Sequence, residues 1–278
     1  MAHICYNGNM MKSDQPVFFS SNRGFRYGDG LFETMKIVHG QIHLDKLHFE
    51  RLFHGLKLLK FQLPDLFTPE YLRENALLLC QKNNCAALGR IRLTVFRGNG
   101  GLHEIDLPAE FIIECWPLDK TSTSFNENGI HIDFFTDVRK SCDLFANLKS
   151  ASHLPYVLAA AFAKEKKLED CIVLNSFGRV ADTSIANIFL IKEDTIYTPS
   201  LAEGCIAGVM RAHLILLLKQ KGMRVQETTI TVNDILETDE LFITNAIRGI
   251  KWVGRCCEKN YTNHKLKMII QDLNYSSL

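Results

Sequence analysis

The chain has 278 residues, of which 46% are hydrophobic and 23% are charged, and its formal net charge at pH 7 is +1. This length accommodates one large domain or two modest ones, each with its own core. The small net charge gives no electrostatic reason to propose nucleic acid or an acidic membrane as a partner. No apolar run approaches the roughly 18 residues of a membrane span. The first residues do not resemble a signal peptide, so we expect a cytoplasmic protein.

The cysteines and histidines show no metal-binding pattern in the sequence. The nine cysteines are scattered, apart from the neighbours Cys256 and Cys257, and no C-x-x-C pair occurs. We therefore expect reduced thiols that mostly fill the core. His39 and His43 are four residues apart, but Gly40 between them indicates a hairpin turn rather than a helix face with two ligands. The sequence thus predicts no metal site.

The first part of the chain interleaves strand and helix patterns. The spacing of leucines from Leu44 to Lys60 predicts a helix, and Thr68 followed by Pro69 begins a second one. The glycine- and charge-rich stretch from Asn22 to Gly30 is typical of a loop. Strand-like patterns occur at residues 4–7, 31–38, 87–96 and 111–116.

A polar stretch without periodicity follows at residues 118–128 and predicts an interdomain linker. It would separate an N-terminal domain, residues 1–117, from a larger C-terminal domain, residues 129–278. Because strands and helices alternate in both parts, we expect mixed α/β domains. In the second domain the patterns predict helices at residues 153–167 and 209–221, strands at 130–136, 171–174, 188–191, 196–198 and 224–229, and a final strand at 239–244.

The stretch from Asp182 to Arg211 carries most of the functional signal. Asp182 to Phe189 is predicted to be a polar turn running into a strand. Gly204 to Gly208 is a loop that opens a helix at about Val209, and such a helix start favours an anion because its N–H groups point outward. A helix that merely begins after a glycine is the simpler interpretation of these residues by themselves.

The spacing of this stretch resembles the signature of the class IV aminotransferases, which are fold-type IV pyridoxal-phosphate (PLP) enzymes. The family has an acidic residue, Ser, Asn, an aromatic residue, Thr, a small residue and a basic residue at set intervals. The first place differs, because the family nearly always has Glu where this chain has Asp182. The matching residues here are Asp182, Ser184, Asn187, Phe189, Thr198, Gly208 and Arg211. The resemblance implies a mixed α/β (α+β) fold with a small N-terminal domain, a C-terminal domain with a β-barrel-like core, and a homodimer.

Further motifs extend this resemblance to the cofactor phosphate. The segment from Arg23 to Thr34 is similar to the N-terminal motif of the family, and His48-Phe-Glu-Arg51-Leu52 is similar to its His-x-x-Arg-Leu motif. The resemblance implies that Arg51 binds the phosphate, to which a guanidinium offers a two-pronged hydrogen bond. The backbone N–H groups that would complete this site belong to Gly208, Val209, Met210, Asn245 and Ala246.

The resemblance also assigns the catalytic groups. Lys149 falls where the family has its Schiff-base lysine, although composition and periodicity do not distinguish it from other lysines. After a substrate amine has formed the external aldimine, this lysine would remove the α-proton. Asp182 would keep the pyridine nitrogen protonated, with a reach shorter than that of Glu by roughly 1.5 Å. Tyr27 would lie beside the lysine, although an aromatic residue that only fills a strand edge explains it as well.

The substrate is less well defined by the sequence. Arg92 and Arg97 lie where family members recruit guanidinium groups for the substrate carboxylate, and Arg26, Phe32 and Thr34 would line the same side. Thr34 and the Arg97–Gly101 loop resemble those of 4-amino-4-deoxychorismate lyases, which release 4-aminobenzoate and pyruvate in folate synthesis. A branched-chain or D-amino-acid aminotransferase using 2-oxoglutarate is the alternative. A protein that binds PLP or another phosphate without catalysis is the third.

Overall fold

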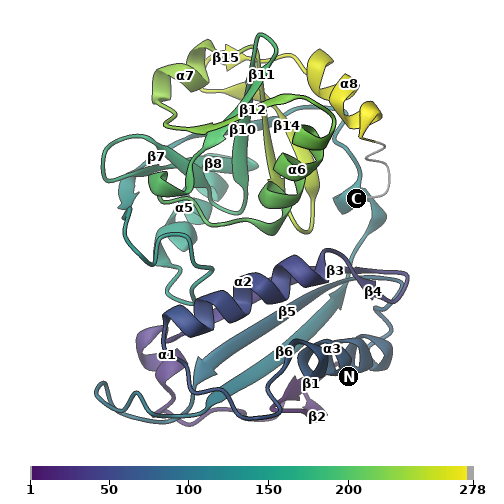
Figure 1. The fold of residues 1–278 in the computed structure, drawn as a ribbon, viewed down its shortest axis with the longest axis vertical. Helices are drawn as coiled ribbons and strands as arrows, with labels where there is room; N and C mark the ends of the chain where they lie inside the picture. The colour runs from purple at the N-terminus through teal and green to yellow at the C-terminus, as the bar shows by residue number, and fades with distance from the viewer. Residues whose placement is uncertain (1, 274–278) are drawn as a thin grey trace. The chain divides into compact units, whose positions relative to one another are not determined.

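A computed structural model of the chain describes residues 2–273, except for the side chains of residues 122 and 123 (Figure 1). Two compact units are present. Unit 1 contains the residues up to Ser122 together with Leu148–His153, and unit 2 contains Thr123–Asn147 and the residues from Leu154 on. The short segment that carries Lys149 therefore belongs to unit 1, although it lies within residues 129–278. No described helix is long and apolar enough to cross a membrane.

Unit 1 is built on an antiparallel sheet with the strand order β2-β1-β6-β5-β3-β4. The hairpin between β3 and β4 turns at His39 and Gly40, as the sequence predicted, and both residues have positive φ angles. The strands are β1 (His3–Tyr6), β2 (Asn9–Lys12), β3 (Gly30–Val38), β4 (Gln41–Ile42), β5 (Leu88–Arg97) and β6 (Ala109–Pro117).

Helices α2 (Asp45–Leu58) and α3 (Pro69–Lys82) share one hydrophobic core with this sheet. Both helices and the Thr68 cap of α3 were predicted. The predicted loop from Asn22 to Gly30 is wrong in part, because Arg23–Tyr27 forms the short helix α1. Its start is capped by the Asn22 side chain, which accepts a hydrogen bond from the Phe25 N–H, and it ends at Gly28 in the left-handed conformation.

The period-2 alternation of the strands decides which side chains face the helices. In β3, Glu33 and Met35 lie on the helix side, so Phe32 and Thr34 lie on the opposite face. Strand β5 pairs with β3 in register, with Arg92 directly opposite Thr34. Three of the predicted substrate residues therefore share the face away from α2 and α3.

Unit 2 contains a larger mixed sheet with the order β12-β11-β10-β13-β14-β7-β8-β9, and β15 pairs with β14. Strand β9, at one end of this order, also contacts β10 and β11, so the sheet curls around its core. The mixed α/β fold class is confirmed. The strands are β7 (Ile130–Lys140), β8 (Asp170–Asn175), β9 (Val180–Thr183), β10 (Asn187–Lys192), β11 (Thr195–Pro199), β12 (Arg224–Thr228), β13 (Glu240–Asn245), β14 (Gly249–Cys256) and β15 (Lys259–Asn260).

Two predictions for this region are corrected. Asp182 and Thr183 do not lie in a turn but in strand β9, which pairs with β8. The strand predicted at residues 239–244 is not the final one, because β14 and β15 follow it. The predicted linker also contains a short helix, α4. The remaining helical segments are α4 (Lys120–Thr123), α5 (Leu154–Glu165), the 3₁₀ turn η1 (Leu201–Glu203), α6 (Val209–Gln220), α7 (Val232–Glu237) and α8 (His264–Asp272).

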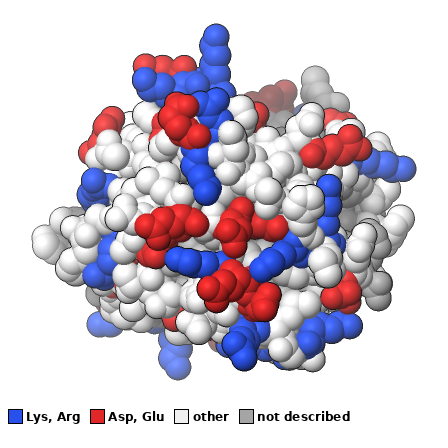
Figure 2. All heavy atoms as spheres, turned by 90° about the horizontal axis from the view of Figure 1, so that it is seen from above, with Lys and Arg blue, Asp and Glu red and all other residues white. Residues whose placement is uncertain are grey.

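Charged side chains of both signs are interspersed on the face drawn in Figure 2. This mixture agrees with the net charge of +1. The sequence argument against a strongly charged partner therefore also fits the surface shown there.

Candidate active site

Lys149 is held by backbone pairing between its segment and the beginning of β3. The Phe32 N–H donates to the Lys149 carbonyl at 2.9 Å, and the Ala151 N–H donates to the Gly30 carbonyl at 2.9 Å. Leu148 is buried in the core of unit 1 and anchors the segment. The Lys149 Nζ lies 4.6 Å from the centre of the Phe32 ring. The lysine is thus placed over a defined position of the sheet.

The Phe32 ring contacts not only Lys149 but also Arg92, one of the substrate residues predicted on the sheet. The guanidinium carbon of Arg92 lies 3.9 Å from the centre of the same ring. Thr34, directly opposite Arg92 in the neighbouring strand, is the next residue on this face. Lys36 follows it and is buried, and burial lowers the pKa of its ammonium. The structure therefore gathers four predicted residues and adds Lys36, which sequence reasoning missed.

Arg97 has a different environment. It is only 5% exposed, and its Nη1 donates to Asp29 Oδ1 at 2.6 Å. Its Nη2 donates to the carbonyls of Leu59 and Lys60 at 2.5 and 3.1 Å, and its guanidinium lies over the Phe61 ring. Arg97 therefore ties the end of β5 to the residues that follow α2.

Arg26 and Tyr27 lie on α1, and both are exposed. The Tyr27 ring contacts the Arg23 guanidinium, whose carbon lies 5.3 Å from the ring centre. Arg26 Nε donates to the Ser20 carbonyl at 2.8 Å. Gly28, the next residue, packs closely on Ser152, because a Cβ there would lie 3.1 Å from the Ser152 Cα. These contacts do not add Arg26 or Tyr27 to the group around Phe32.

Arg51 forms a two-pronged ion pair with Glu33 across the interface between α2 and β3. Its Nε and Nη2 lie 2.8 and 2.5 Å from the two carboxylate oxygens, and His48 Nδ1 lies 2.6 Å from Oε2. Burial raises the pKa of Glu33, but the charges and hydrogen bonds of Arg51 and His48 outweigh it and lower the pKa to about 2. The carboxylate therefore stays ionised and fixes the orientation of the guanidinium.

In unit 2, Asp182 is buried, and its two carboxylate oxygens differ in their hydrogen-bond partners. Oδ2 accepts hydrogen bonds from the Tyr156 hydroxyl at 2.7 Å and from the Ile206 N–H at 3.0 Å, and Lys140 Nζ lies 3.5 Å away. Oδ1 is also buried, and it has no hydrogen-bond partner among the described residues. A buried carboxylate oxygen without a donor is costly, so this atom is suited to a donor that a bound molecule brings.

Lys140 and Tyr156 were missed by sequence reasoning. Both are buried, and Lys140 Nζ contacts the Tyr156 hydroxyl and donates to the Ala146 carbonyl at 3.3 Å. Burial and the negative charge of Asp182 raise the pKa of Tyr156 well above its usual value. Tyr156 therefore remains protonated and donates to Asp182. The sequence contains no signal for this group, because its members come from β7, α5 and β9.

The signature residues mainly build the loop that carries the Ile206 N–H. Asn187 Nδ2 donates to the Ile206 carbonyl at 2.8 Å. A Cβ on Gly208 would lie 1.9 Å from Asn187 Oδ1, so only glycine fits beside this amide. Arg211 Nη2 donates to the Pro199 carbonyl at 2.8 Å, and Ser184 Oγ donates to Asp170 Oδ1 at 2.5 Å. These residues act on Asp182 through the backbone that they position.

The predicted phosphate-binding segments meet at one end of the unit 2 sheet. Helix α6 begins at Val209 with Gly208 as its cap, so its first N–H groups have no partner within the helix. Asn245 ends β13, and its side chain accepts hydrogen bonds from the N–H groups of the two residues after Ala246. Asn187, which touches Gly208, pairs with the residue before Asn245. The two segments are therefore neighbours.

Comparisons with known proteins were consistent with this geometry. The family model for amino-transferase class IV matches residues 30–256. Aminodeoxychorismate lyase of Vibrio harveyi is 28% identical over 82% of this chain and 83% of its own length. A putative branched-chain-amino-acid aminotransferase of Methanocaldococcus jannaschii is 29% identical over 89% of this chain and 85% of its own.

A solved structure shares the fold. The branched-chain aminotransferase of Thermoproteus uzoniensis, crystallised with norvaline, superimposes with a TM-score of 0.88 over 99% of this chain and 96% of that one. Its sequence identity is 19%, so this similarity supports the fold alone.

Proposed function

Because the chain belongs to the class IV amino-transferase family, we propose that it is a PLP-dependent enzyme that moves the α-proton of an amino substrate. One observation carries the proposal. Asp182 offers a buried oxygen, Oδ1, without a partner among the described residues, while Oδ2 is held by Tyr156 and Ile206. A protonated pyridine nitrogen is the donor that such an oxygen lacks. The residues of unit 2 thus fit the cofactor.

PLP, when bound, supplies a ring that withdraws electrons from the carbon next to the substrate amine. Asp182 would keep that ring protonated. Tyr156 and the Ile206 N–H stabilise the carboxylate as an anion, and Lys140 adds a positive charge nearby. The side chain of Asp182 is one methylene shorter than Glu, and these three groups fix where its free oxygen points.

Lys149 would carry the cofactor and then take the α-proton as a general base. Its backbone is paired with β3 and its Nζ lies over Phe32, so the amine has a defined position in unit 1. A general base is efficient only when it is held within reach of the proton. The pairing of residues 149–151 with β3 provides that rigidity.

The phosphate would be bound by Arg51 and by the N–H groups that begin α6 and follow β13. Glu33 holds the Arg51 guanidinium in one orientation, which reduces the entropy lost when an anion binds. Val209 and Met210 contribute N–H groups that have no partner within their helix.

For the substrate, we favour 4-amino-4-deoxychorismate, which would be cleaved to 4-aminobenzoate and pyruvate. Arg92 places a guanidinium on the Phe32 face of the sheet, and Lys36 adds a buried amine on the same face, which suits a substrate with two carboxylates. The Vibrio relative is named as this lyase. An aminotransferase acting on a branched-chain or D-amino acid is the second candidate, because the Methanocaldococcus relative is named as one. The buried contacts of Arg97 weaken the sequence argument based on that residue.

The test is a parallel assay of the purified protein with PLP. One reaction contains 4-amino-4-deoxychorismate and is followed by 4-aminobenzoate and pyruvate. The others contain L-leucine, L-glutamate or D-alanine with 2-oxoglutarate. Release of pyruvate with 4-aminobenzoate supports the lyase, and keto-acid formation alone supports the aminotransferase. A protein that binds PLP but turns over none of these substrates contradicts both, and Lys149→Ala controls for contaminating enzymes.

We also propose that the enzyme is a homodimer, as the family resemblance implies. Unit 1 exposes large apolar side chains, including Phe19 at 75% and Phe25 at 80%. These side chains are candidates for a surface that another chain covers. Light scattering should give twice the mass of one chain, which is 31.7 kDa. A mass equal to one chain contradicts the proposal.

A further inference from the structure

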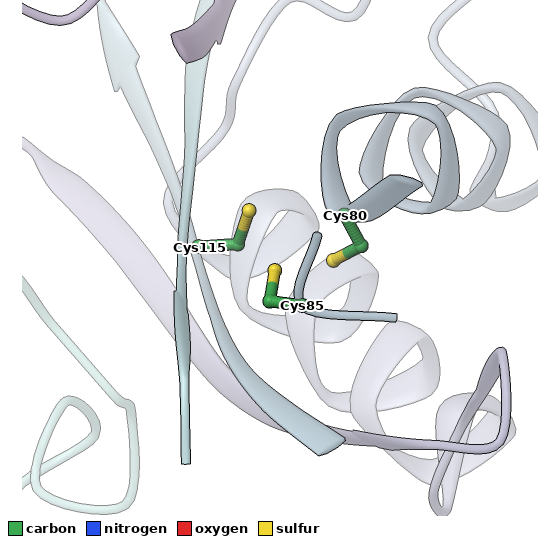
Figure 3. A group of neighbouring side chains, drawn as sticks. All are labelled: Cys80, Cys85 and Cys115. Atoms are coloured by element: carbon green, nitrogen blue, oxygen red, sulfur yellow. The ribbon is translucent and has the colours of Figure 1, made fainter. Parts of the chain in front are cut away.

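Three buried cysteines converge in unit 1, on the side of the sheet that faces α3 (Figure 3). Cys80 lies in the last turn of α3, Cys85 follows that helix, and Cys115 lies in β6. Their three sulfur atoms all lie within 4.8 Å of one another. We propose that Cys80, Cys85 and Cys115 bind a single thiophilic cation, Cu(I), at a site distinct from the residues assigned to PLP.

The backbone at the end of α3 brings Cys80 and Cys85 together. Asn84 has a positive φ of 56°, and its N–H donates to the Gln81 carbonyl at 3.1 Å. The Cys85 N–H donates to the Cys80 carbonyl at 2.9 Å. These two bonds define a Schellman motif, in which the side chains at the positions of Cys80 and Cys85 meet. The pair therefore follows from local geometry rather than from a C-x-x-C spacing.

Cys115 reaches the pair through the alternation of β6. Phe111, Ile113 and Cys115 point to the helix side and are buried. Gly89 in β5 allows the close approach of Cys85, because a Cβ at Gly89 would lie 2.5 Å from the Cys85 carbonyl oxygen. One thiol from α3, one from the turn after it and one from β6 thus meet at a single position in the core.

One polar side chain also reaches the cluster. The Asn83 Nδ2 donor lies 3.3 Å from the Cys115 sulfur. A donor at this position suits a sulfur that binds a metal ion as a thiolate.

The type and the number of the ligands select the ion. A monovalent ion needs fewer thiolates to neutralise it than a divalent ion, and a net charge left in an apolar core is costly. Zn²⁺ in structural sites takes four ligands, but the group contains three. Thiolates favour Cu(I) among soft ions. Sulfur atoms about 2.3 Å from a common centre are about 4 Å apart, which is compatible with the observed cluster. Copper stays Cu(I), and each thiol that becomes a thiolate releases one proton.

The experiment titrates the reduced full-length protein with Cu(I) without oxygen, in competition with a coloured Cu(I) chelator. We expect one tightly bound Cu(I) per chain and a higher melting temperature. Cys115→Ser should weaken binding by at least about 100-fold, since losing even an outer-shell partner costs 10–100-fold. Cys171→Ser, which alters a buried cysteine of unit 2, is the matched control and should bind as the native chain does.

The outcomes separate clearly. Failure of the native chain to compete with the chelator overturns the proposal, and so does equal binding by Cys115→Ser. Binding of Zn²⁺ as tight as that of Cu(I) overturns the choice of ion. Cys80→Ser is a second variant in case Cys115→Ser does not fold, as judged by circular dichroism. None of these measurements requires PLP, so they are independent of the proposed enzymatic activity.

Discussion

The Tyr156 hydroxyl lies 2.7 Å from Asp182 Oδ2, and both side chains are buried in unit 2. Because the pKa of Tyr156 is raised by burial and by the Asp182 charge, the proton stays on the tyrosine. The carboxylate consequently accepts on Oδ2 and leaves Oδ1 for a ligand. This relationship explains how a residue shorter than the Glu of the family can be held at a fixed position.

Asp182→Asn tests the charge of this group. The variant keeps the shape of the side chain but cannot hold a pyridine nitrogen in the protonated state. We expect PLP to remain bound and turnover to fall by about 100-fold or more, which is the typical size of a lost proton-transfer contribution. Visible absorbance measures binding, and kcat measures the loss. Turnover equal to that of the native enzyme would refute the role of Asp182.

Asp182→Glu tests whether the short side chain is adapted to its surroundings. The added methylene has to fit among Tyr156, Lys140 and the Ile206 N–H, which already contact the carboxylate. We expect a loss of about 1–3 kcal/mol in the free energy of unfolding, from overpacking, and no gain in kcat. Urea denaturation and steady-state kinetics measure the two. Increased kcat at unchanged stability would contradict this account.

Tyr156→Phe removes the donor to Asp182. We expect stability to fall by about 1–2 kcal/mol and kcat to fall with little change in KM. Tyr261→Phe is the matched control, because Tyr261 is also buried and its hydroxyl donates to the Ile235 carbonyl at 2.8 Å. The control should lose similar stability but keep its kcat. Equal kinetic effects of both variants would show that Tyr156 is only structural.

Arg92 and Arg97 should respond differently to removal of the charge. Arg92→Met is expected to raise KM for a carboxylate substrate by about 10-fold or more, because a charge-assisted hydrogen bond is lost. Arg97→Met should instead destabilise the protein by about 3–5 kcal/mol, since it leaves the partly buried Asp29 with one fewer partner. Kinetics and urea denaturation of both variants measure this. The reverse assignment of effects would place Arg97 at the substrate.

Glu33 should make stability depend on pH in the acid range. Its pKa is lowered to about 2 in the folded protein, against an ordinary value of 4.5. The unfolded chain therefore binds a proton first as the pH falls, and the stability due to Glu33 is complete above about pH 4.5 and lost towards pH 2. Glu33→Gln should flatten this part of the profile. If the unfolding free energy of Glu33→Gln changed with pH between 5 and 2 as steeply as that of the native chain, the ion pair with Arg51 would be contradicted.

Local patterns predicted much of the fold. The leucine spacing before Lys60, the Thr68 cap and the glycine before Val209 place three helices correctly, because each depends on nearby residues. Asp182 was assigned to a turn because Asp, Thr and Ser favour turns. In the structure Thr183 and Ser184 bond Asp170, so a partner more than ten residues away allows polar side chains to lie buried there.

Some residues of the candidate site could be predicted from the sequence, and others could not. Lys149, Arg51 and Asp182 were identified through the resemblance to a family, and the structure describes the contacts that hold each of them. Lys140 and Tyr156 could not be predicted, because they reach Asp182 from elements distant in the sequence. Likewise, the backbone turn that joins Cys80 to Cys85 and the strand register that adds Cys115 are not visible in residue spacing.

The attachment point of the cofactor tests the central claim most directly. The protein is incubated with PLP, reduced with borohydride, digested and sequenced by tandem mass spectrometry. Our account predicts a yellow protein before reduction and a single phosphopyridoxyl group on Lys149 after it, which is absent in Lys149→Ala. A colourless protein, or a group attached to another lysine, would contradict the account.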